Sequence, residues 1–182
     1  MKNKTIIQLV FCALFAALTA VVSQFSIPIG PVPINLATLS VFIAGAVLGA
    51  KYGAISQFVY VLLGAVGLPV FAGFSGGVHV IVGPTGGYLI GYVAAAWLVG
   101  VLVARFGASV LTLVIAMAAG LALCYLMGTI WFMIVTKTAL WASLTLCVFP
   151  FLIGDAVKIA AAAALIPQLN KAFHKTLAGQ LA

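Results

Sequence analysis

The chain has 182 residues, of which 66% are hydrophobic and 5% are charged. A soluble domain could not cover its surface with so few polar groups, so the composition indicates an all-α polytopic membrane protein. The net charge of +7 comes from basic residues scattered along the chain, which argues against a nucleic-acid-binding protein. We expect one transmembrane domain, residues 1–182, embedded in a lipid bilayer.

Six transmembrane helices are predicted from apolar segments that approach or exceed the length needed to cross a bilayer. The predicted helices cover residues 5–25, 34–50, 52–67, 86–104, 109–135 and 144–167. Pro28, Pro31 and Pro33 interrupt the chain between the first two, because proline lacks a backbone N–H and breaks helices.

The N-terminal segment also resembles a secretory signal peptide, since a basic start precedes an apolar run. A cleavage-like sequence occurs at Ala17-Leu18-Thr19-Ala20. The run is long enough to span a membrane and further spans follow, so we expect it to stay in place as the first helix.

The distribution of basic residues predicts the orientation in the membrane, because cytoplasmic loops carry an excess of Lys and Arg. With both termini in the cytoplasm, only Lys137 is external and Lys158 lies within a span. The remaining basic residues are then cytoplasmic: Lys2, Lys4, Lys51, Arg105, Lys171 and Lys175.

This orientation places the two elaborate connections, residues 26–33 and 68–87, on the external side. The second is long, rich in glycine and aromatic residues, and uncharged. Non-helical backbone at membrane depth is tolerated only where it is buried in protein or lines a cavity. We therefore expect a binding site that is open to the outside.

Asp155, the only acidic residue of the chain, lies in an apolar stretch with Lys158 three residues away. Each charge costs about 2.5–3.5 kcal/mol at the centre of a membrane helix. Positions three apart share a helix face, so the two groups can converge and bind a cyclic urea or amide. The alternatives are a structural ion pair and a pair that binds a partner helix.

The segment Gly83-Pro-Thr-Gly-Gly-Tyr88 opens the fourth predicted helix, with Thr85 as its expected cap. The N–H groups and dipole at a helix start attract anions, so a substrate carboxylate can bind there. The alternative is a turn that simply needs glycine.

Other polar and aromatic residues are candidates to line the same pocket. Gln57 and Tyr60 share a face of the third predicted helix, where they line the pocket or bridge helices. Phe71, Phe74 and Ser75 in the external loop form an apolar lid, or the rings anchor the loop at the membrane interface.

The first helix carries small residues that would let another helix approach closely. They are Ala13, Ala16, Ala17 and Ala20. Such patterns support docking onto a separate protein, and internal packing of the chain is the alternative.

Several kinds of chemistry have no residues to carry them. There is no phosphate-binding G-x-x-x-x-G-K-[ST] motif, no H-E-x-x-H or G-x-S-x-G motif and no pair of carboxylates, so we expect neither an enzyme nor a cofactor. Cys12, Cys124 and Cys147 lie in apolar runs without ligand spacing, so we expect no disulfide and no metal site.

Taken together, these segments resemble the BioY family, the biotin-specific substrate-binding subunits (S components) of energy-coupling-factor (ECF) vitamin transporters. The resemblance is carried by residues 31–35, 48–49, 56–73, 83–88 and 154–158. It implies six helices, cytoplasmic termini and a biotin pocket that includes Asn35 and Tyr88. Asn35 and Ala37 also mark a departure, because this segment often carries Thr and Gln in the family.

The resemblance further implies partners and a location. S components dock through small residues of the first helix on a scaffold membrane subunit that carries two cytoplasmic ATPases. The expected location is the cytoplasmic membrane of a bacterium or archaeon. Two alternatives remain, namely an S component for another vitamin such as thiamine or riboflavin, and a self-sufficient secondary transporter or channel. A self-sufficient transporter would be expected to show repeated halves or a broken helix pair, and the sequence shows neither.

Overall fold

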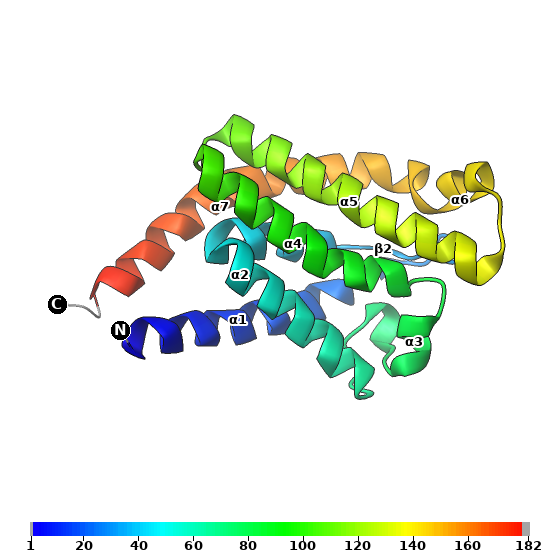
Figure 1. Cartoon of the computed structure of the whole chain (residues 1–182), viewed down its shortest axis with the longest axis horizontal. Coiled ribbons are helices and arrows are strands. Elements are labelled where there is room, and N and C mark those ends of the chain that lie inside the picture. The colour runs from blue at the N-terminus through cyan, green and yellow to red at the C-terminus, as the bar shows by residue number, and fades with distance from the viewer. Residues whose placement is uncertain (1, 180–182) are drawn as a thin grey trace.

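The computed structural model describes residues 2–179 of the chain, with side chains for residues 5–173. The molecule is a bundle of long helices, and the two ends of the chain lie at the same end of the bundle (Figure 1). The long elements are α1 (Lys2–Ser23), α2 (Ala37–Ala65), α4 (Gly86–Phe106), α5 (Val110–Thr136) and α7 (Leu152–Gly179).

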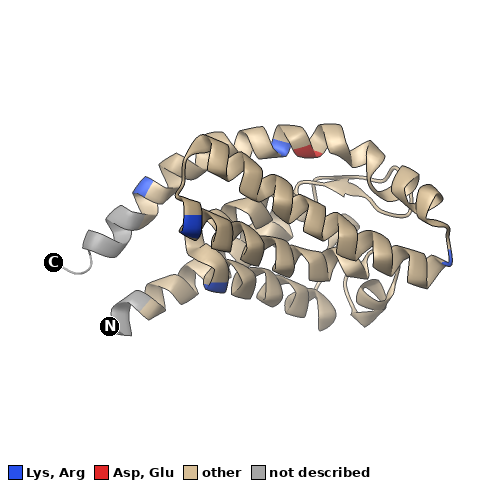
Figure 2. Ribbon diagram, turned by 45° about the horizontal axis from the view of Figure 1, so that its top comes forward, with Lys and Arg blue, Asp and Glu red and all other residues tan. Residues whose placement is uncertain are grey.

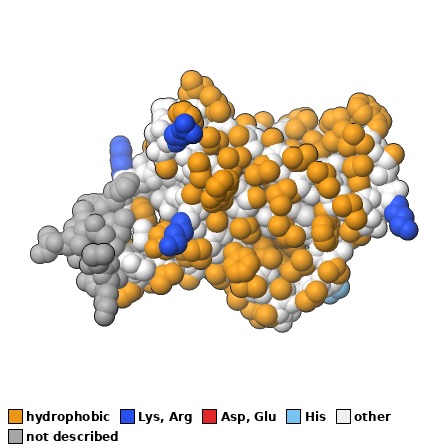
Figure 3. Space-filling view, in the orientation of Figure 1, with side chains coloured by type: hydrophobic (Ala, Val, Ile, Leu, Met, Phe, Trp, Pro, Cys, Tyr) orange, Lys and Arg blue, Asp and Glu red, His pale blue; other side chains and the backbone are white. Residues whose placement is uncertain are grey.

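Five segments of the described residues are long and apolar enough to cross a membrane. Hydrophobic side chains also cover much of the face drawn in Figure 3, where basic side chains appear toward the ends. In water such a surface would be unfavourable, whereas in a bilayer it faces lipid tails. The prediction of a helical, multi-span membrane protein is confirmed.

A short two-stranded ribbon joins α1 to α2. β1 (Ser26–Ile27) pairs antiparallel with β2 (Ile34–Asn35), and the proline-rich residues 28–33 form the turn. The predicted start of the second helix at Ile34 is therefore wrong, since α2 begins at Ala37. The Asn35 side chain accepts a hydrogen bond from the Ala37 N–H at 3.0 Å, which satisfies one of the unpaired donors at the helix start.

α2 contains a break at Gly49, whose φ of 77° and ψ of 177° are not helical. A Cβ added to Gly53 would lie 2.8 Å from the Cα of Gly45. In a straight helix, residues eight apart are separated by about 12 Å, so the chain turns back at Gly49 and packs its two halves together. The sequence predicted two helices here, ending at Ala50 and beginning at Tyr52, close to the observed break.

Replacing Gly49 with Ala is expected to destabilise the protein by about 1–3 kcal/mol, because only glycine adopts this backbone region readily. No neighbouring atom lies within 4 Å of the added Cβ, so backbone strain is the only cost. The measurement is the thermal unfolding midpoint in detergent. Gly30→Ala is the matched control, because Gly30 also has open space around it and an ordinary φ. Equal midpoints for the two variants would contradict the assignment of Gly49 as an obligatory turn.

The C-terminal helical segment differs from the predicted helix over 144–167. α6 (Leu140–Cys147) ends in a 3-10 turn at Phe149–Phe151, and α7 then continues beyond Pro167. The break occurs at Pro150, where the missing N–H and the fixed φ favour a fresh helix start. Pro167 does not end α7, in keeping with the tolerance of membrane helices for proline.

The loop between α2 and α4 contains a 3-10 turn (Ala72–Phe74) and the short helix α3 (Val78–Val82). The C-terminal end of α1 holds this loop in place. Ser23 donates to the Val70 carbonyl at 2.7 Å, and the Gln24 side chain accepts from the Phe74 N–H at 2.8 Å. The external loop of the sequence prediction is thus folded and anchored to the bundle.

Candidate functional site

A cavity of about 160 Å³ lies between α2, α4, α5, α7 and the loop that precedes α4. Most of the residues predicted to bind substrate line it. They are Asn35, Tyr60, Phe71, Ser75, Thr85, Tyr88, Asp155 and Lys158. Residues far apart in the sequence therefore converge on one space.

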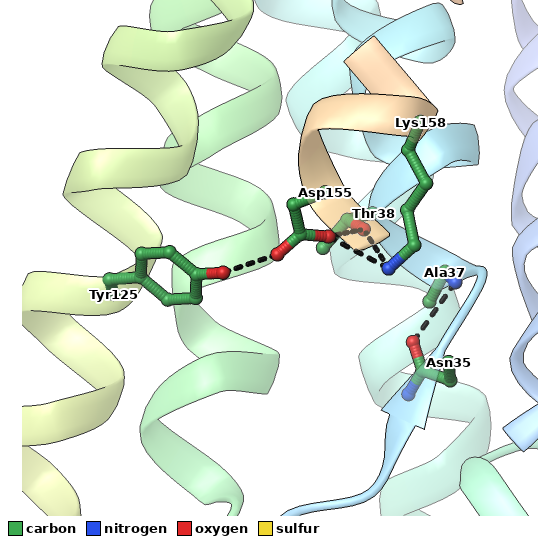
Figure 4. A network of polar contacts seen from close by, with 6 residues as sticks. All are labelled: Asn35, Ala37, Thr38, Tyr125, Asp155 and Lys158. Atoms are coloured by element: carbon green, nitrogen blue, oxygen red, sulfur yellow. Dashed lines mark hydrogen bonds and ion pairs between the residues drawn. The ribbon is translucent and has the colours of Figure 1, made fainter. Parts of the chain in front are cut away.

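Asp155 and Lys158 form a buried ion pair on α7, with 2.7 Å between Lys158 Nζ and Asp155 Oδ1 (Figure 4). Only 2% of Asp155 and 6% of Lys158 is exposed. Both residues also line the cavity, so the pair is screened from lipid and open to a ligand. The i,i+3 spacing brings the two groups together as predicted.

Two hydroxyl groups complete the network around the carboxylate. The Thr38 hydroxyl donates to Asp155 Oδ1 at 3.2 Å and accepts from Lys158 Nζ, also at 3.2 Å. The Tyr125 hydroxyl donates to Asp155 Oδ2. The three groups come from three elements, because Thr38 lies on α2, Tyr125 on α5 and the ion pair on α7 (Figure 4).

Sequence reasoning missed Thr38 and Tyr125, as well as the cavity-lining Tyr92. Thr and Tyr are common in membrane helices and no motif marks these positions. The only available signal was that Tyr125 is a hydroxyl-bearing residue inside a strongly apolar span, where polar groups need partners.

The aromatic side of the cavity is formed by Phe71 and Tyr60, whose rings meet edge to face with centroids 5.5 Å apart. Phe71 is 1% exposed, so it is a wall of the cavity and not an outer lid. A Cβ at Gly64 would lie 2.0 Å from the Phe71 ring, which explains why the smallest residue stands beneath it.

Tyr88 and Thr85 lie at the start of α4. The Tyr88 hydroxyl donates to the Cys147 carbonyl at 3.2 Å, which ties α4 to the end of α6. Thr85 occupies the N-cap position, as predicted, but its side chain makes no capping hydrogen bond. The predicted capping role of Thr85 is therefore wrong, whereas its position on the cavity is as expected.

Two predicted substrate-binding residues lie outside the cavity lining. Gln57 is fully buried, accepts a hydrogen bond from Thr19 at 3.2 Å and donates to Ser56. It bridges α1 and α2, which is the alternative that the sequence left open. Phe74 is 72% exposed, in keeping with the alternative of anchoring at the membrane interface.

The small residues of α1 do not share one face. Ala13 and Ala17 are exposed, Ala20 is intermediate, and Ala16 is 1% exposed within the core. The prediction that all four form a docking surface is therefore wrong for Ala16, whose small side chain serves internal packing. Ala13 and Ala17, four residues apart, remain available to a partner helix.

Comparison with known proteins identifies the family of this chain. A family model described as "BioY family" matches residues 1–175. The chain belongs to the BioY family. The resemblance carried by the sequence motifs is thereby confirmed, and BioY proteins are transporter subunits and not enzymes.

Two curated BioY relatives are similar along most of their length. A protein of Pyrococcus horikoshii named "Probable biotin transporter BioY" is 43% identical over 158 residues, covering 87% of this chain and 93% of the relative. The "Biotin transporter BioY" of Thermotoga maritima is 40% identical over 164 residues, covering 90% and 96%.

A solved structure has the same fold. It is described as the S-component for biotin from an ECF-type ABC transporter, and it superposes with a TM-score of 0.88. The sequence identity is 29%, and the match covers 94% of both chains. The helices of this chain are therefore arranged as in that S-component.

Proposed function

We propose that the chain is the S component of an ECF-type transporter and that it captures biotin from the external side for uptake. The observation that carries the proposal is the buried Asp155–Lys158 pair facing a cavity in a member of the BioY family. The relatives named as biotin transporters support the choice of ligand.

The chemistry of biotin matches the two ends of this cavity. A cyclic urea presents N–H donors beside a carbonyl acceptor, which complement the Asp155 carboxylate and the Lys158 ammonium. Phe71 and Tyr60 provide an apolar wall for the ring and tail. Ser75 and Thr85 also lie on the lining. The Thr85 hydroxyl can donate to the biotin carboxylate, whereas the Ser75 hydroxyl donates to the Ala72 carbonyl at 2.9 Å.

The proposal includes six membrane crossings with both termini in the cytoplasm. The reversal of the chain at Gly49 supports two crossings within α2. Both termini and the α4–α5 turn lie at one end of the molecule (Figure 1). Lys137 follows α5 at the opposite end. Most of the ribbon segments coloured for Lys and Arg in Figure 2 accordingly lie toward the end that carries the termini.

The sole acidic residue appears in Figure 2 roughly midway along the molecule. The loop with α3 and the start of α4 lie at the end away from the termini (Figure 1). In the proposed orientation, biotin enters from that external end and reaches the ion pair deep within the membrane. Energy for release on the other side comes from a scaffold subunit and two cytoplasmic ATPases.

The function is tested by thermal unfolding of the purified chain in the presence of single vitamins. A ligand that binds only the folded state raises the unfolding midpoint, with about 2.7 kcal/mol of added stability at a hundredfold excess over its Kd. Biotin is expected to raise the midpoint, whereas thiamine and riboflavin are not. Stabilisation by one of those vitamins, with none by biotin, would assign the cavity to a different substrate.

The orientation is tested by cysteine labelling in intact cells with a membrane-impermeant reagent. A cysteine placed at Gly73 or Gly77 in the external loop is expected to react, whereas one at Lys51 or Arg105 is not. Membrane disruption should make the latter two reactive, which controls for accessibility. Labelling of the Lys51 and Arg105 cysteine variants in intact cells would show that the proposed orientation is wrong and that these turns face outside.

A further inference from the structure

Both oxygens of the Asp155 carboxylate accept hydrogen bonds, and each oxygen has a different set of donors. Lys158 and Thr38 engage Oδ1. Tyr125 alone engages Oδ2, and it does so from α5. A carboxylate held at one oxygen can turn about its bond to Cβ. A second anchor on another helix fixes the plane of the carboxylate relative to the bundle.

The same hydrogen bond limits what a ligand can offer to Asp155. An ionised carboxylate has about four acceptor sites. Lys158, Thr38 and Tyr125 occupy sites on it, so little acceptor capacity remains for a ligand. Tyr125 also lines the cavity itself. The remaining lone pair therefore has a direction that is set by Tyr125.

We propose that Tyr125 is a positioning residue that aims the free lone pair of Asp155 into the cavity and thereby selects a ligand with a ring N–H donor. This selectivity role rests on the proposed biotin function, whereas the positioning role does not. Tyr125 performs no chemistry. It acts through Asp155, and its effect is a preference among ligands of the same shape.

The positioning role has a direct spectroscopic test, because Asp155 is the only acidic residue in the chain. Aspartate labelled with carbon-13 at its side-chain carboxyl and incorporated by cell-free synthesis gives one resonance that reports on Asp155 alone. Tyr125→Phe removes the donor to Oδ2 and is expected to shift this resonance without any ligand present. Tyr52→Phe is the matched control, because Tyr52 lies on α2 outside the cavity lining, and it should leave the resonance in place.

The selectivity role is tested with biotin and a cyclic carbamate analogue, in which oxygen replaces one ring N–H. The unmodified protein is expected to prefer biotin by about tenfold to hundredfold, the value of one hydrogen bond to a charged group. Tyr125→Phe is expected to reduce this preference several-fold, since the carboxylate can turn away from the missing donor. Tyr52→Phe should retain it.

The outcomes separate the two proposals. An unchanged carboxyl resonance in Tyr125→Phe would overturn the positioning role, whatever the ligand. A shifted resonance with an unchanged biotin-to-carbamate ratio would overturn the selectivity role, as would equal weakening of both ligands. Failure of the unmodified protein to bind biotin would overturn the proposed function and the selectivity role, while the resonance would still decide whether Tyr125 positions Asp155.

Discussion

Replacing Asp155 with Asn is expected to weaken biotin binding by about thirtyfold to several thousandfold. The change keeps the shape of the side chain but turns an acceptor-only group into one that also donates. It also leaves the buried Lys158 ammonium without its counter-ion. Loss of one partner of a buried, hydrogen-bonded charge pair costs about 2–5 kcal/mol, which corresponds to this range of affinity.

The measurement is isothermal titration of purified variants with biotin, after each has been shown to be monodisperse in detergent. Ser143→Ala is the matched control, because Ser143 is equally buried and hydrogen-bonded but lies outside the cavity lining. It should bind biotin as the parent does. A folded Asp155→Asn protein with the affinity of the parent would show that the ion pair is structural and that biotin binds elsewhere.

Replacing Ala17 with Trp is expected to abolish assembly with the proposed scaffold and ATPase subunits while biotin binding persists. Ala17 is exposed on α1, so the larger side chain fits the isolated chain but prevents close approach of a partner helix. Ala13 lies one turn away on the same exposed face and should behave in the same way. Co-purification of the tagged variant with the other subunits is the measurement.

Two further Trp variants control for bulk and for folding. Ile130 is 50% exposed on α5, so Ile130→Trp should assemble normally. Ala16 is 1% exposed, so Ala16→Trp should lose the folded state and not merely the complex. Normal assembly of Ala13→Trp and Ala17→Trp would show that this face of α1 contacts only lipid.

The sequence predicted the charged centre of the site because membrane burial makes ionised groups expensive. Asp155 and Lys158 were conspicuous for that reason, and their spacing fixed their mutual approach. Phe71 and Ser75 were also assigned to the pocket, since an uncharged, glycine-rich loop at membrane depth must be buried in protein. These inferences needed no knowledge of which helices are neighbours.

The partners of the pair could not be predicted, because they depend on that neighbourhood. Thr38 and Tyr125 reach Asp155 from other helices, and each is an ordinary hydroxyl residue in its own segment. The sequence also did not show which face of α1 packs against the rest of the bundle. Alanine spacing cannot separate the buried Ala16 from the exposed Ala17, since both fit a small-residue pattern.

The accuracy of the predicted helix ends varied along the chain. The boundary predicted between the second and third helices lies within two residues of Gly49, where only glycine readily accepts the observed φ of 77°. Pro167 misled the prediction at the other end of the chain, since α7 continues past it. The rule that proline ends a helix comes from soluble proteins and is weaker in a membrane.

Equilibrium binding of radiolabelled biotin to the purified, detergent-solubilised chain tests the central claim most directly. Saturable binding of about one biotin per chain is expected, displaced by unlabelled biotin but not by thiamine and lost in Asp155→Asn but not in Ser143→Ala. A monodisperse parent protein without saturable biotin binding, or one whose binding is indifferent to Asp155→Asn, would contradict the assignment of this cavity as the biotin site.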